Sequence, residues 1–199
     1  MNDRLFIYVM RIRDDKKQEA LLLATIKLVN EIGFAASSVA KIAREAGVSP
    51  ATLYIYFKNK EDLLVSTYLE IKQGMGKAML EGFDEAAPLY ETLHQVWKNT
   101  FTYVVQNPEE FRYVEQFSNS PYSDKVDPQK VQEQFEPLLL AIRHGIEQKI
   151  IKNVSLDVLG AFLIHPIMVL ANPRHCKTFH ATEENVAAAF SMAWDAIKR

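Results

Sequence analysis

The chain has 199 residues, of which 48% are hydrophobic and 24% are charged. This balance is ordinary for a globular protein and excludes disordered and collagen-like chains, while a single cysteine, Cys176, excludes an intrachain disulfide and favours a cytoplasmic location. The net charge of −2 is unevenly distributed, since residues 1–60 carry 10 Lys and Arg against 6 Asp and Glu and the remainder carries 13 against 19. A basic excess at the N-terminal end is expected where that end contacts an anionic partner such as DNA.

The first 14 residues contain an apolar run at 5–10 that is too short to span a bilayer and is followed by no small-residue cleavage site. We therefore expect neither a membrane span nor a secretory signal. Because the run ends in Met10 and precedes a well-formed helix, we expect residues 1–14 to be an extension upstream of the natural start or a flexible arm, and we assign it no function.

The first clear helix is predicted at 15–33, and Gly33 marks its C-terminal end. Its apolar residues recur at three- and four-residue spacing: Leu21, Ala24, Leu28 and Ile32. Two short helices come next. One spans about 38–46 after a serine cap, and the other begins with Ser49 as its cap and Pro50 in its first turn. The tight turn between them predicts a helix-turn-helix.

Helical patterns continue to the end of the chain, with no convincing strand. A long helix at 60–82 carries an apolar stripe that can pack against both the N-terminal module and the helices after it: Leu64, Tyr68, Ile71, Met75 and Met79. Further helices are predicted at 86–107, 108–119, 128–151, 155–172 and 182–198, and Pro166 should kink the fourth of these after Leu163. The fold class is therefore all-α, with about nine helices.

The second short helix of the helix-turn-helix is the candidate DNA-reading element. Leu53 and Phe57 are four residues apart and should point inward, which leaves the outer side for a major groove. Base edges and thymine methyl groups suit the residues at the start and middle of this helix, whereas phosphates suit Tyr56, Lys60 and the N-terminal end of the preceding helix. The candidate DNA contacts are Ser38, Lys41, Ser49, Pro50, Ala51, Thr52, Tyr54, Ile55, Tyr56 and Lys60.

This segment resembles the DNA-binding domain of the TetR family. The similarity rests on a helix that ends at Gly33-Phe34 and on five spaced elements after it: Ala40-Lys41-Ile42-Ala43, Glu45-Ala46-Gly47-Val48-Ser49, Thr52-Leu53-Tyr54, Tyr56-Phe57 and Lys60-Glu61-Asp62-Leu63-Leu64. The family often has threonine where Ser38 or Val39 stands and frequently a larger polar residue near Ile55. The resemblance implies a helix-turn-helix domain at 15–62 and a ligand-binding and dimerisation domain at 63–199.

The resemblance also implies a homodimer formed by the last two long helices and a ligand pocket in the C-terminal domain. We expect the dimer to use one apolar face of each helix: Leu156, Leu159, Leu163, Ile167 and Leu170 on the first, and Val186, Phe190, Trp194 and Ile197 on the second. Candidate ligand contacts are the aromatic residues Trp97, Phe101, Phe111, Phe117, Phe135 and Phe162, and His165 beside the predicted kink. Such residues favour an apolar or aromatic inducer, and aromatic rings can also hold a cationic one.

The function predicted is a ligand-responsive repressor that binds a palindromic operator as a dimer and is released by its inducer. Three alternatives are a regulator of the same fold that needs no ligand or activates, a helical protein whose N-terminal module binds another protein, and a helical enzyme. No phosphate-binding Gly-rich loop, GxSxG or HExxH motif occurs, so we expect neither catalysis nor a cofactor. His175, Cys176 and His180 lack the spacing and the second cysteine of a structural metal site, so we expect no metal.

Overall fold

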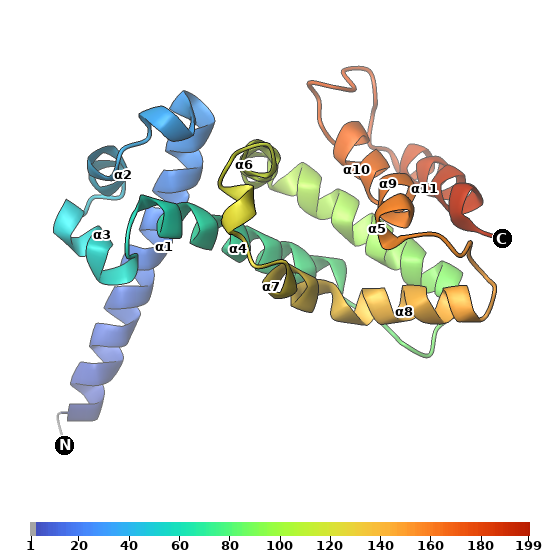
Figure 1. Cartoon of the computed structure of the whole chain (residues 1–199), viewed down its shortest axis with the longest axis horizontal. Helices are drawn as coiled ribbons and strands as arrows, with labels where there is room; N and C mark the ends of the chain where they lie inside the picture. The colour runs from blue at the N-terminus through green and yellow to red at the C-terminus, as the bar shows by residue number, and fades with distance from the viewer. Residues whose placement is uncertain (1–2) are drawn as a thin grey trace. The chain divides into compact units, whose positions relative to one another are not determined.

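A computed structural model describes residues 3–199, with side chains described from Asp15 onward (Figure 1). Over these residues the chain forms eleven α-helices and two short 3-10 helices, with no strand beyond one isolated bridge. The predicted all-α class is confirmed. The helices divide into two compact units, which are described separately below. No helix in the described part of the chain is long and apolar enough to cross a membrane.

The first unit contains residues up to Ile71 together with Glu109–Val126. Its elements are α1 (Asp3–Ala36), α2 (Val39–Glu45), α3 (Pro50–Tyr56), the first half of α4 (Lys60–Met79), α6 (Pro108–Ser118) and the 3-10 helix η1 (Ser123–Lys125). Helix α1 begins at Asp3, so the described part of the expected N-terminal extension continues the first helix, whereas residues 1–2 lie outside the described residues. Both α2 and α3 pack against α1 (Figure 1).

The regular turns of α1 are interrupted at Gly33, as its sequence position predicted. Gly33 has φ 76° and ψ 170°, a conformation that residues with a side chain rarely adopt. The Ser37 hydroxyl donates to the Gly33 carbonyl at 2.7 Å, which satisfies one acceptor at this interruption. Leu21, Ala24 and Leu28 are buried as predicted, but Ile32 is exposed because it lies away from the face that α2 and α3 cover.

Two apolar clusters form the core of the first unit. One joins α1, α2, α3 and the start of α4: Leu21, Ala24, Leu28, Ile42, Leu53, Phe57 and Leu63. The other joins α1, α4 and α6: Ile26, Val29, Leu64, Ile71, Tyr113 and Phe117. Together they fix α2, α3 and α6 on the same two scaffold helices, α1 and α4.

Helix α6 belongs to the first unit, although the predicted domain boundary at 62/63 assigned it to the second. The reason is a polar network around Asn30, which is 4% exposed. The Asn30 amide nitrogen donates to the carbonyl and the carboxylate of Glu109 at 2.8 Å each, Arg112 donates to the Asn30 carbonyl at 2.7 Å, and Gln116 donates to its Oδ1 at 2.8 Å. The Tyr113 hydroxyl also donates to the Leu64 carbonyl at 2.8 Å, and burial raises the pKa of Tyr113.

The second unit contains residues 72–108 and 127–199. Besides the end of α4, its elements are α5 (Leu89–Gln106), α7 (Pro128–Gln132), the 3-10 helix η2 (Glu133–Phe135), α8 (Glu136–Glu147), α9 (Leu156–Leu163), α10 (His165–Leu170) and α11 (Glu183–Ile197). Helix α5 lies at its centre and contacts α8, α10 and α11 (Figure 1). The single helix expected at 128–151 is divided into α7, η2 and α8.

The break that Pro166 predicts is confirmed, because α9 ends at Leu163 and α10 begins at His165. The backbone N–H of Ile167 donates to Ile164, so it does not reach the carbonyl of Leu163. That carbonyl instead accepts a 2.7 Å hydrogen bond from the indole Nε1 of buried Trp97. The proline kink thereby anchors α9 to α5 at the centre of the second unit.

Candidate nucleic-acid interface and ligand grooves

The turn between α2 and α3 is closed by backbone hydrogen bonds that its sequence favours. Gly47 has φ +68° and donates to the Arg44 carbonyl at 3.1 Å, and Val48 donates to the Ala43 carbonyl at 2.9 Å. Ser38 and Ser49 cap α2 and α3, since each side chain accepts from the backbone N–H three residues later. Both caps and the glycine turn agree with the predicted helix-turn-helix.

Helix α3 is amphipathic over only seven residues. Leu53 is fully buried and Phe57, directly after the helix, is 3% exposed, which confirms their predicted inward position. On the opposite side Tyr54 is 56% exposed and Ile55 is 77% exposed. Pro50 and Ala51 are also exposed. The predicted DNA-reading side of α3 is therefore uncovered within this chain.

Three other predicted contacts on this helix-turn-helix are partly engaged. The Thr52 hydroxyl lies 2.9 Å from the Ser49 hydroxyl, so the two share one hydrogen bond at the start of α3. Tyr56 is half-buried, with its ring 6.4 Å from that of Phe57. Ser38 is exposed but uses its oxygen as the α2 cap. These side chains support the shape of the surface as well as forming part of it.

Two predicted phosphate-binding lysines lie beside the C-terminal end of α1. The ammonium group of Lys60 donates to the Phe34 carbonyl, and that of Lys41 donates to the Ala36 carbonyl at 3.0 Å. Partial burial lowers the pKa of Lys60. Since an ammonium group has three donors, each contact leaves two N–H groups for a further acceptor. These carbonyl contacts also hold both lysines near the helix-turn-helix.

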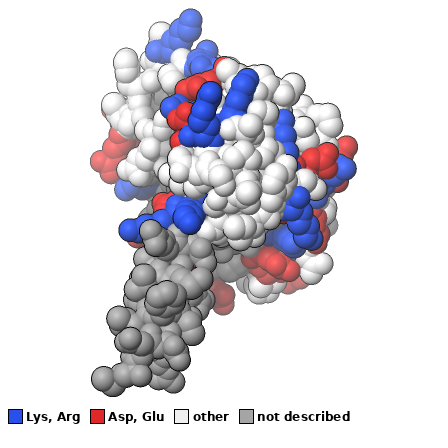
Figure 2. Space-filling model, turned by 90° about the vertical axis from the view of Figure 1, so that its left-hand side faces the viewer, with Lys and Arg blue, Asp and Glu red and all other residues white. Residues whose placement is uncertain are grey.

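The charges around α3 suit a polyanion. Helix α3 itself carries no charged residue, whereas Lys41, Arg44 and Lys58 in the neighbouring segments are exposed. Figure 2 views the end at which α2 and α3 lie in Figure 1, and it shows a broad area without charged groups, bordered by Lys and Arg side chains together with some Asp and Glu. An uncharged helix with exposed basic residues beside it matches the division of a DNA surface into base-reading and phosphate-binding parts.

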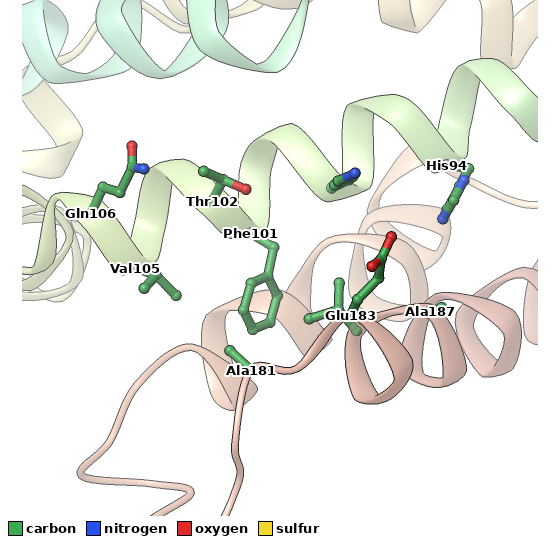
Figure 3. A pocket seen from close by; sticks show the side chains of 10 residues that line it. His94, Phe101, Thr102, Val105, Gln106, Ala181, Glu183 and Ala187 are labelled. Carbon is green, nitrogen blue, oxygen red and sulfur yellow. The ribbon is translucent and has the colours of Figure 1, made fainter.

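The second unit contains a groove of 460 Å³ between α5 and the start of α11 (Figure 3). Its apolar lining includes Phe101, one of the predicted ligand residues, together with Val105 and Val186. His94 and Lys98 on α5 and Glu183 on α11 bring polar groups to the same groove, and Figure 3 shows the Glu183 side chain directed toward α5. An apolar groove with a few charged groups suits a small amphiphilic or aromatic molecule.

A second groove of 730 Å³ lies along α9, α10 and α11, and it contains the predicted ligand residues Phe162 and His165. Its surroundings are unusually apolar for an exposed surface. Phe162 is 55% exposed and Met192 is 75% exposed, and further exposed apolar side chains lie on α9 and α10: Leu156, Val158 and Val169. An exposed apolar groove of this kind is typical of a protein interface.

The set of dimer residues expected from sequence needs correction. Leu159, Leu163, Ile167, Phe190 and Ile197 are each 2% exposed or less and form the core of the second unit, so they are not available to a partner. Their helices pack against each other and against α5, which buries the stripe that the sequence pattern selected. Of the other expected residues, Leu156 is exposed, and three are half-buried: Leu170, Val186 and Trp194. Phe162 and Met192, which were not expected at the dimer, lie on the outer face.

The remaining predicted ligand residues are mostly packing residues. Trp97 in the second unit and Phe117 in the first are fully buried, and Phe111 is half-buried on α6. Phe135 is half-buried in the second unit, with the Lys72 ammonium 5.4 Å from its ring centre, and burial lowers the pKa of Lys72. The seven predicted residues thus do not form one site within either unit.

His175, Cys176 and His180 lie in the segment between α10 and α11. Among the described residues, no group of three or more His, Cys, Asp or Glu side chains is placed to hold a metal ion. The groove residues His94, Lys98 and Glu183 had no distinguishing sequence signal, because a charged residue on a helix is ordinarily a solvated one. Only the packing of α11 against α5 brings them together.

The chain matches two family models that together cover most of its length. Residues 21–67 match the model described as bacterial regulatory proteins, tetR family, and residues 88–198 match the model described as tetracyclin repressor-like, C-terminal domain. The first match contains the helix-turn-helix, and the second contains all of α5 to α11.

Individual relatives agree with these matches. A solved TetR family transcription regulator from Marinobacter aquaeolei VT8 is 38% identical, with a TM-score of 0.87 over 95% of this chain and 100% of that one. An uncharacterized HTH-type transcriptional regulator of Haemophilus influenzae is 24% identical over 91% of this chain and 95% of its own length. A fatty acid metabolism regulator protein of Bacillus subtilis is 37% identical over 86 residues, which are 43% of this chain and 44% of that protein.

The helix-turn-helix and the match to bacterial regulatory proteins define a DNA-binding transcriptional regulator rather than an enzyme. The chain belongs to the TetR family of bacterial regulatory proteins.

The turn of the helix-turn-helix should be sensitive to the conformation of Gly47. A Cβ atom at this position would meet no atom within 4 Å, so the cost of Gly47→Ala arises from the positive φ alone. We expect a loss of roughly 1–2 kcal/mol in the free energy of unfolding, measured with urea. Gly47→Asn should lose less, because asparagine tolerates this conformation better.

Gly160→Ala in α9 is the matched control. Its Cβ atom would also meet nothing within 4 Å, but its backbone is helical, so the change should be neutral or stabilising by up to about 1 kcal/mol. Equal effects of the two alanine substitutions would show that the turn does not depend on the positive φ at Gly47.

Proposed function

We propose that this protein is a repressor that binds a palindromic operator as a homodimer and is released by a small apolar or aromatic inducer. The observation that carries the proposal is the uncovered, uncharged side of α3 beside exposed basic residues. Ser38, Lys41, Ser49, Pro50, Ala51, Thr52, Tyr54, Ile55, Tyr56 and Lys60 are the proposed contacts. A dimer would place two copies of α3 about 34 Å apart, the spacing of successive major grooves.

The exposed apolar face of α9, α10 and α11 supports the homodimer. Phe162 and Met192 are large apolar side chains that a monomer would leave in water. Pairing with the same face of a second copy would bury them, and a twofold axis brings like surfaces together. We assign this face to dimerisation, so the 730 Å³ groove on it belongs to the interface rather than to the inducer.

The groove between α5 and α11 is the better candidate for the inducer. Only Asn107 separates the end of α5 from the start of α6. A ligand that shifts the end of α5 would therefore also displace the start of α6. Helix α6 in turn holds α1 through the Asn30 network. This route needs no contact with α3 itself, because α1 is the scaffold on which α2 and α3 pack.

Operator binding should depend on Tyr54. We expect the protein to bind the DNA upstream of its own gene and Tyr54→Ala to weaken that binding about fivefold or more, because a base contact in the major groove is worth about 1 kcal/mol or more. Fluorescence anisotropy at several salt concentrations measures both affinity and salt slope. Lys41→Ala should lower the slope by about one.

Tyr90→Ala is the control, because Tyr90 is 45% exposed but lies in the second unit. It should leave the affinity for DNA unchanged. Equal affinities of wild-type protein and Tyr54→Ala for every upstream fragment would rule out α3 as the reading helix.

An inducer should stabilise the protein and release the operator together. We expect at least one compound in a panel of aromatic, cationic and long-chain fatty acyl compounds to raise the melting temperature, since saturation a hundredfold above Kd adds about 2.7 kcal/mol. The fatty acyl members are included because the Bacillus subtilis relative is named as a fatty acid metabolism regulator.

Val105→Trp, which places an indole in the α5–α11 groove, should abolish the response to that compound. Leu140→Trp, at an exposed position on α8, should preserve it. A panel that stabilises nothing and releases no DNA would favour a regulator of the same fold that needs no ligand. A response that persists in Val105→Trp would place the inducer elsewhere.

The dimer should require the outer face of α9 and α11. Phe162→Glu combined with Met192→Glu should convert the protein to a monomer in sedimentation equilibrium and weaken operator binding with it, because like charges would face each other across the twofold axis. Leu140→Glu is the control and should remain dimeric. A wild-type monomer, or a double variant that stays dimeric, would contradict the proposed interface.

A further inference from the structure

We propose that Ile55 reads a thymine methyl group, so that operator recognition by α3 rests on apolar contact rather than on paired hydrogen bonds. This inference rests on the proposed function, since it assumes that α3 enters the major groove. It adds the chemistry of the base that α3 selects and the side chain that selects it.

Helix α3 offers no side chain that can form a paired hydrogen bond with a base. Its sequence from Pro50 to Tyr56 contains no Arg, Lys, Asn, Gln, Asp or Glu. Paired contacts to guanine require Arg or Lys, and those to adenine require Asn or Gln. The Thr52 hydroxyl is already within 2.9 Å of the Ser49 hydroxyl, which leaves the exposed Tyr54 to offer a hydroxyl from the middle of the helix.

The polar residues directly after α3 have structural duties. The Asn59 side-chain oxygen accepts from the backbone N–H of Asp62 at 2.8 Å, at the start of α4. The Asp62 carboxylate accepts from the backbone N–H of Lys58 at 2.8 Å. The Asn59 amide is therefore committed to the local turn, and a paired contact from it to adenine would have to break the hydrogen bond to Asp62.

The exposed side of α3 is instead apolar. Ile55 is the most exposed large apolar side chain in the described part of the chain, at 77%. Ala51 lies four residues earlier and is also exposed, so the two share one side of the helix. Thymine is the base whose major-groove edge carries a methyl group, and it is therefore the base that an exposed aliphatic side chain can select.

The position of Ile55 on α3 allows its contact with a base to be tested without disturbing the fold. Leu53 and Phe57 hold the helix from the opposite side, so substitution of Ile55 removes no buried contact. Contact with one methyl group should change affinity about fourfold, the equivalent of burying one CH₂ group. The half-site should therefore contain a thymine whose methyl group contributes to the affinity and whose hydrogen-bonding groups do not contribute to it.

The experiment first selects operators for the full-length protein from a random duplex library. Each thymine of the selected half-site is then replaced by deoxyuridine, which removes the C5 methyl group and retains the hydrogen-bonding groups. We expect one position at which this replacement weakens binding about fourfold for each half-site. Ile55→Gln should abolish this effect and favour adenine at the same position, because glutamine pairs with adenine in the major groove.

Leu23→Gln is the matched control, since Leu23 is an exposed apolar residue on α1 and lies outside α3. It should retain the selected sequence and the deoxyuridine effect. Circular dichroism should show unchanged folding for both glutamine variants.

The inference is overturned if every deoxyuridine replacement is neutral, if the selected half-site contains no thymine, or if the effect persists in Ile55→Gln. Selection of no sequence at all would contradict the proposed function instead. Sequence-specific binding without a methyl effect would leave that function intact while removing this inference.

Discussion

The burial of Leu53 and Phe57 is the constraint on which the proposed DNA-binding surface depends. Helix α3 has seven residues, too few for a stable helix on its own, so its form and direction come from packing rather than from propensity. Leu53 and Phe57 supply that packing against a cluster on α1 and α2 that includes Leu21 and Ile42. Once these two side chains point inward, helical geometry leaves Tyr54 and Ile55 facing out.

Local features explain why the helix-turn-helix could be predicted in detail. The caps at Ser38 and Ser49 and the turn at Gly47 each join residues that are at most five positions apart. A short stretch of sequence therefore shows both partners of each of these interactions. The kink at Pro166 was predictable for the same reason, but the partner of the freed Leu163 carbonyl was not. Trp97 is 66 residues away, and its hydrogen bond depends on how α5 packs against α9.

Long-range packing explains the contacts that the sequence interpretation could not identify. Helix α6 joins the first unit through Asn30 and Glu109, which are 79 residues apart, and neither residue has a pattern that reveals the pairing. On α9 and α11 the apolar residues surround much of each helix, so periodicity could not distinguish the side that faces α5 from the side that faces outward. Leu163 became core, while Phe162 became surface. Aromatic content likewise identified helices rich in large side chains without separating packing residues from groove residues.

The Asn30 network has the energetic scale that the proposed inducer response requires. Each of its hydrogen bonds contributes about 0.5–1.5 kcal/mol net, with more expected for the contact from Arg112, and all converge on one buried residue. Allosteric coupling between an inducer and an operator typically requires about 1–3 kcal/mol. Loss of one or two of these bonds is therefore sufficient. Because hydrogen bonds weaken steeply with misalignment, a small displacement of α6 would break the bonds to Asn30 together. Helix α1 would then change between two discrete arrangements rather than shift gradually.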